Sequence, residues 1–137
     1  MKEMIYKLKL ETECLDKGTY NGIDYIIVSY GTHPCAYIKI PETSKFYKVD
    51  RDDVPEELDS VVHGGITWSG PIPPRLSADG FYYGWDYCHV GDFTGTDLMF
   101  PPDLRTGGKK WTTEEILDEV KAAIDILNVL EEESNYD

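Results

Sequence analysis

The sequence is poor in the residues that mark several common protein classes. It has three cysteines, Cys14, Cys35 and Cys88, an odd number with no CxxC spacing, which argues against a disulfide framework or a zinc knuckle. Charges interrupt every apolar run near Met1, and no window approaches the roughly 20 apolar residues that span a bilayer. We therefore expect a cytoplasmic protein with no signal peptide, no transmembrane helix and no membrane partner.

Basic residues are also scarce. Lysine and arginine number 13 against 26 acidic residues, which gives a net charge of −13. Proteins that hold nucleic-acid backbones need clustered lysine and arginine, so we expect no nucleic-acid partner. Much of the acidity lies near the C-terminus, where residues 111–137 contain nine acids and one base, Lys121. These acids indicate either a solvated helix face or a surface that docks on a basic protein.

The first half of the chain has the residue pattern of β-strands. Apolar and polar residues alternate over residues 4–11, and β-branched and aromatic residues dominate 23–30 and 35–40. Asn21-Gly22 favours a type I′ hairpin turn. The pattern predicts an antiparallel meander. Further expected elements are a strand at 46–49, a short helical turn at 52–58, a proline-containing loop at 69–75 and a strand at 80–87.

The C-terminal segment has the pattern of an amphipathic helix from about Thr113 to Leu130. Thr112 and Glu115 have capping-box spacing. The apolar stripe that follows consists of Ile116, Val120, Ala123, Leu127 and Leu130. At 137 residues the chain is close to the usual size of one domain. We expect a single domain, 1–137, of the α+β class, with an antiparallel β-sheet or meander packed by one long C-terminal α-helix. The apolar stripe could equally serve a homo-oligomer interface.

Two glycine-bounded segments, 63–70 and 84–92, hold two of the three histidines. Glycine allows positive φ and leaves room for a ligand to approach. If the segments fold side by side, two imidazoles and two carboxylates would converge, a donor set that suits Zn²⁺, Mn²⁺, Fe²⁺ or acid/base chemistry. The candidate metal ligands are His63, Asp86, His89 and Asp92. The alternative is that these side chains satisfy backbone groups in turns.

The same segments are rich in aromatic residues and hydroxyl groups. Aromatic walls stack on bases, while glycine amides, hydroxyls and a guanidinium hold phosphate. Aromatic residues in strands are otherwise ordinary core residues. The predicted ligand-binding residues are His63, Gly64, Gly65, Thr67, Trp68, Ser69, Trp85, Asp86, His89, Asp92 and Arg105.

The two segments resemble a family of small, mostly uncharacterised proteins encoded by bacteriophages and prophages. The likeness lies in an HGG-x-T-x-S core at 63–69 and a D-x-x-H-x-G-D core at 86–92, and extends loosely to the terminal helix. No established reaction accompanies the family. The resemblance implies a protein of the host-cell cytoplasm, where small phage proteins often block host defences.

These observations lead to three functional hypotheses. The first is a phage-type counter-defence protein that captures a small, phosphate-containing, nucleotide-like signal in a glycine- and aromatic-lined pocket. The second is a hydrolase of a phosphoester, using either a divalent metal or His/Asp acid-base chemistry. The third is an acidic inhibitor of a host defence protein that acts through its C-terminal helix, with Glu131, Glu132 and Glu133 at the interface.

Overall fold

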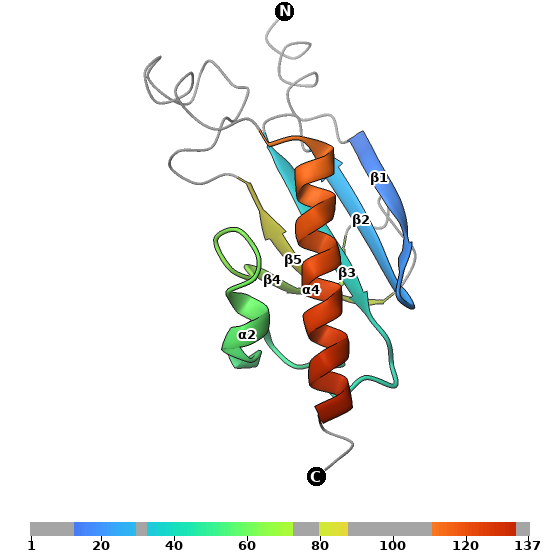
Figure 1. The fold of residues 1–137 in the computed structure, drawn as a ribbon, viewed down its shortest axis with the longest axis vertical. Coiled ribbons are helices and arrows are strands. Elements are labelled where there is room, and N and C mark those ends of the chain that lie inside the picture. Colours follow the sequence, from blue (N-terminus) through green and yellow to red (C-terminus); the bar gives the residue numbers. More distant parts are fainter. Residues whose placement is uncertain (1–12, 30–32, 73–79, 88–110, 134–137) are drawn as a thin grey trace, which may run out of the picture.

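The computed structural model describes residues 13–29, 33–72, 80–87 and 111–133, in which five strands form one sheet beside a long helix (Figure 1). The strand order is β1-β2-β3-β5-β4, and every neighbouring pair is antiparallel. The strands are β1 (Glu13–Tyr20), β2 (Ile23–Ser29), β3 (Pro34–Ile40), β4 (Trp68–Gly70) and β5 (Phe81–Asp86); the helices are η1 (Arg51–Asp53), α2 (Glu56–Asp59) and α4 (Thr113–Glu133).

The first hairpin follows the sequence prediction. Asn21 and Gly22 have φ values of 46° and 84° and connect Tyr20 to Ile23, which face each other across the strand pair. Positive φ at both central residues is the requirement of a type I′ turn. The predicted strands at 23–30 and 35–40 correspond to β2 and β3. The predicted strand at 4–11 lies outside the described residues.

The prediction of a strand at 46–49 is wrong. Successive tight turns replace it, with N–H groups of Ser44, Tyr47 and Val49 donating to carbonyls three residues earlier. These local bonds use backbone groups that a strand would offer to a neighbour. The side chain of Phe46 is nevertheless buried in the core. The expected helical turn at 52–58 is present as two short pieces, η1 and α2.

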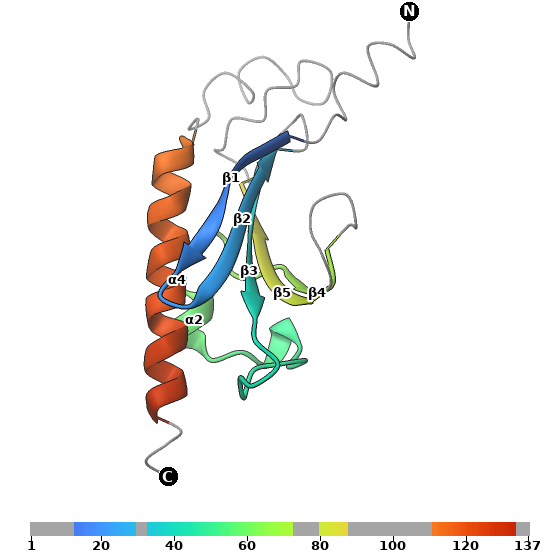
Figure 2. The same ribbon diagram turned by 90° about the vertical axis from the view of Figure 1, so that its right-hand side faces the viewer.

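Helix α4 covers one face of the sheet, as the turned view makes clear (Figure 2). The predicted capping box is formed, since the Glu115 amide donates to Thr112 Oγ1 at 3.1 Å and the Thr112 amide to Glu115 Oε1 at 3.1 Å. The helix continues to Glu133, three residues past the predicted end. Its predicted stripe faces the sheet: Ile116, Val120, Ala123 and Leu127 are buried and Leu130 is partly buried against the same core. The α+β architecture is therefore as predicted.

The two faces of the sheet have separate apolar clusters. The cluster under α4 includes Ala36, Tyr83 and Trp85. Strand alternation places their neighbours on the other face, where a second cluster contains Ile26, Val28, Cys35, Ile72 and Tyr82, with Tyr37 against it. Among the described residues, no helix is both long and apolar enough to cross a membrane. The face opposite α4, which carries Tyr37, has one of the two hollows described below.

Candidate functional site

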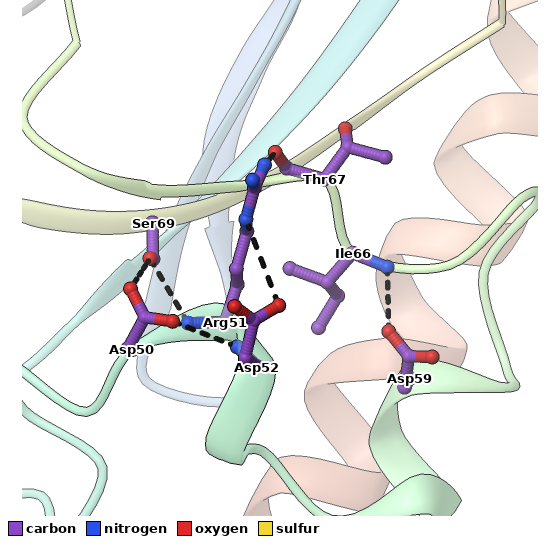
Figure 3. Close-up of polar contacts among 7 residues, drawn as sticks. All are labelled: Asp50, Arg51, Asp52, Asp59, Ile66, Thr67 and Ser69. Atoms are coloured by element: carbon purple, nitrogen blue, oxygen red, sulfur yellow. Dashed lines mark hydrogen bonds and ion pairs between the residues drawn. The ribbon is translucent and has the colours of Figure 1, made fainter.

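The glycine pair of the first segment closes a tight loop on α2. Gly64 and Gly65 have φ values of 73° and 82°, as expected for glycines that allow a left-handed backbone. The next amide, that of Ile66, donates to Asp59 Oδ1 at 2.8 Å (Figure 3). A Cβ added at Gly65 would lie 3.2 Å from either oxygen of that carboxylate. The space beside Gly65 is thus occupied by an acid of the protein itself.

Part of the predicted phosphate cradle already has acceptors within the protein. The Gly65 amide donates to the Val62 carbonyl at 3.0 Å, and the His63 amide donates to Glu119 Oε1 at 3.0 Å. The Ile66 amide donates to Asp59, so the amides of His63, Gly65 and Ile66 all have acceptors within the protein. A phosphate would have to displace one of them and then lie next to a carboxylate. The geometry supports a structural role for the loop.

The His63 side chain belongs to an aromatic group under helix α4. Its ring stacks on Tyr87, with centroids 5.3 Å apart and planes 6° apart, and contacts Trp111 at 4.8 Å. The Tyr87 hydroxyl donates to Glu119 Oε1 at 2.7 Å and accepts from Trp85 Nε1 at 2.9 Å. Glu119 therefore ties the His63 loop and the end of β5 to the helix.

The structure does not bring His63 and Asp86 together. Asp86 is the last residue of β5 and follows Trp85, which packs in the cluster under α4, so strand alternation places its carboxylate on the opposite face of the sheet. His89 and Asp92, the other predicted metal ligands, are outside the described residues, as is Arg105. Within the described ranges, no group of three or more His, Cys, Asp or Glu side chains could hold a metal ion.

The two tryptophans of the predicted pocket have opposite environments. Trp85 is only 1% exposed and packs in the core under α4, so its ring has no open face on which a base could stack. Trp68 is 45% exposed on the edge strand β4, and its Nε1 donates to the Pro71 carbonyl at 3.2 Å. Of these two predicted ligand-binding residues, Trp68 has an exposed ring and Trp85 does not.

Trp68 borders a hollow on the sheet face opposite α4, which we call the Trp68 hollow. Its volume is about 220 Å³ and its lining residues are Cys35, Tyr37, Thr67, Trp68, Trp85 and Asp86. Gly84 lies beneath the Tyr37 ring, because a Cβ there would come within 2.5 Å of that ring. The Thr67 hydroxyl is 3.5 Å from Asp86 Oδ2, a long hydrogen bond. The hollow thus combines aromatic surface, a hydroxyl and a carboxylate.

Arg51 supports the outer edge of β4 (Figure 3). Its guanidinium donates to the Thr67 carbonyl, and its amide donates to Ser69 Oγ at 3.0 Å. Ser69 Oγ in turn lies 3.4 Å from Asp50 Oδ1, so the predicted phosphate-binding hydroxyl already has a carboxylate neighbour. Sequence reasoning missed Arg51. The available signal was a single base within an acidic run, Asp50 to Asp59.

Comparison of the chain with protein-family models, with curated proteins and with solved structures found no match. The resemblance to phage proteins therefore stays a prediction based on residues 62–92.

Proposed function

We propose that the protein is a small-molecule-binding protein that captures a nucleotide-like, phosphate-containing ligand, with the base in the Trp68 hollow. The observation that carries the proposal is the 45% exposure of Trp68 next to the Asp86 carboxylate in one concave site. A counter-defence role in a phage-infected cell is the biological setting that the sequence resemblance suggests.

The lining of the Trp68 hollow suits a base better than it suits a phosphate. An indole face stacks on any base, and such stacking contributes about 1 to 3 kcal/mol. A carboxylate accepts hydrogen bonds at two oxygens, so Asp86 favours a base edge with adjacent N–H donors, as guanine has, and repels an anion. A volume of 220 Å³ is below the roughly 300 to 1,000 Å³ of typical ligand sites. The hollow would therefore hold the base while the sugar and phosphate extend beyond it.

Binding has more support than hydrolysis. The enzyme hypothesis needs an imidazole and a carboxylate at one point, whereas His63 and Asp86 lie on opposite sides of the sheet. The acidic-helix hypothesis also loses support, because several helix acids have internal partners. Asp125 accepts from Tyr20 and Asn21, and Glu131 accepts from Ser44.

The test is calorimetry of the whole protein against nucleosides and linear or cyclic nucleotides. Trp68→Ala should weaken binding by about 1 to 3 kcal/mol, the stacking contribution. Val129→Ala is the matched control, because Val129 is similarly exposed, at 48%, but lies on α4. Circular dichroism checks that both variants are folded.

Two results would overturn this proposal. The first is no binding to any member of the panel, and the second is unchanged affinity in Trp68→Ala. Chromatography of the recovered ligand distinguishes binding from hydrolysis, since a chemically altered ligand would favour the hydrolase hypothesis.

A further inference from the structure

A second and larger hollow lies where the chain leaves β3, and we call it the Lys39 hollow. Its volume is about 460 Å³, within the range of typical ligand sites. The lining residues are Lys39, Ile40, Pro41, Glu42, Thr43, Tyr47 and Gly80. No motif in the sequence pointed to this region.

Gly80 makes room for the Lys39 side chain. A Cβ at Gly80 would lie 2.7 Å from Lys39 Cε, closer than real Cβ contacts allow. Gly80 also has a φ of 152°, which L side chains rarely adopt. The lysine stem therefore lies against a glycine at the start of β5, and its position in the wall of the hollow depends on that missing side chain.

A second ammonium group lies near one of the residues that line the hollow. Lys48 Nζ is 5.6 Å from the centroid of the Tyr47 ring, which lines the hollow. Lys48 is one of two non-glycine residues with positive φ in the described part of the chain, at 66°. Long side chains are uncommon in that region of backbone space. The turns at 41–49 thus present a lysine next to the aromatic wall.

The local charge is less negative than that of the molecule as a whole. The chain carries a net charge of −13, yet the charged residues that line this hollow are one lysine, Lys39, and one carboxylate, Glu42, and Lys48 lies near the lining residue Tyr47. Within the described ranges the ion pair recorded is Arg51 with Asp52, so neither Lys39 nor Lys48 is neutralised by a salt bridge there. An anion can be held locally by such a site despite an unfavourable total charge.

We propose that the Lys39 hollow binds the phosphate groups of a small molecule. The Lys39 and Lys48 ammonium groups would pair with phosphate oxygens, and the Thr43 hydroxyl would donate a hydrogen bond. Lys39 and Tyr37 share one face of β3, two residues or roughly 7 Å apart at the usual strand rise. A single nucleotide could then span both hollows, an extension that rests on the proposed function. Phosphate binding itself does not depend on it.

The experiment is calorimetry of the full chain with inorganic pyrophosphate at low ionic strength. Lys39→Gln should weaken pyrophosphate binding at least tenfold. Lys17→Gln removes the same charge from an exposed position on β1 and should change the affinity less than twofold. Glu42→Gln should strengthen binding, because it removes a repelling carboxylate. Undetectable pyrophosphate binding, or equal weakening by Lys39→Gln and Lys17→Gln, would overturn the inference.

A nucleoside without phosphate separates this inference from the proposed function. Nucleoside binding should be weakened by Trp68→Ala and unaffected by Lys39→Gln, while pyrophosphate binding should show the reverse. Pyrophosphate binding without nucleoside binding supports the Lys39 site and overturns only the base site. Nucleoside binding without pyrophosphate binding supports the base site and overturns only the Lys39 site.

Discussion

At the residue scale, a glycine in this protein can be required because of its positive φ alone, or also because a side chain would not fit beside it. Gly22 and Gly65 have nearly equal φ values, 84° and 82°. A Cβ at Gly22 would meet nothing within 4 Å, whereas at Gly65 it would meet the Asp59 carboxylate at 3.2 Å. The two positions therefore form a natural comparison.

Gly65→Ala should destabilise the protein more than Gly22→Ala. Both substitutions place an L side chain in the left-handed region, which costs roughly 1 to 2 kcal/mol. Gly65→Ala also disturbs the carboxylate that accepts the Ile66 amide, and a buried donor that loses its acceptor costs about 1 to 3 kcal/mol. Urea denaturation of both variants measures the difference. Equal losses would show that Asp59 does not hold the loop in solution.

The buried tyrosine Tyr83 shows how one side chain can hold a turn in place. The Tyr83 hydroxyl, under α4, donates to the Val49 carbonyl at 2.8 Å. Burial raises the pKa of this phenol above its ordinary value of 10.0, and the nearby negative charges of Asp50 and Asp53 raise the pKa further. Tyr83 therefore anchors the turn region beside the Lys39 hollow in its neutral form.

At the element scale, helix α4 holds the sheet mainly through its apolar stripe. Leu127 is 1% exposed and belongs to the main core cluster. Polar contacts at two points add to this packing. Glu119 accepts from the His63 loop and Tyr87, and Asp125 accepts from the β1–β2 hairpin.

Leu127→Ala should lower the free energy of unfolding by about 2 to 5 kcal/mol, because it leaves a cavity in the core. Val129→Ala, two residues along the same helix and 48% exposed, should change it by about 0.5 kcal/mol or less. Chemical denaturation monitored by circular dichroism gives both values. Similar midpoints for the two variants would contradict the packing of α4 on the sheet.

At the scale of the whole molecule, charge limits the partners. A net charge of −13 repels a polyanion over most of the surface, whereas a small anion meets only its local surroundings. At the proposed phosphate site, Lys39 and Lys48 would provide such surroundings within the acidic protein.

The protein should therefore bind a nucleotide more tightly than duplex DNA. Fluorescence anisotropy with a labelled duplex at physiological salt should detect no complex, while calorimetry detects the nucleotide. Raising the salt concentration distinguishes the two kinds of contact, because duplex binding would weaken steeply with salt. A duplex bound as tightly as a nucleotide would contradict this expectation.

Local patterns in the sequence determined the C-terminal helix, the Asn21-Gly22 turn and the strand that follows it. Helix periodicity, a capping box and a type I′ turn depend on residues close in the chain, so neighbouring residues suffice to specify them. The capping box predicted from Thr112 and Glu115 is an example, because both of its hydrogen bonds are formed. The prediction of a strand at 46–49 is wrong because tight turns satisfy the backbone groups of this segment locally. The burial of Phe46 is compatible with these turns and did not require a strand.

Only the tertiary structure decided which predicted site residues face one another. Alternation separates Trp85 from Asp86, but a strand pattern alone does not say which face the long helix covers. The helix covers the face of Trp85, and His63 joins that side through Tyr87 and Glu119. Asp86 is left with Trp68 on the other face. Packing under α4 therefore separates His63 from Asp86 and the exposed Trp68, because partners distant in sequence meet only once the sheet and helix have packed.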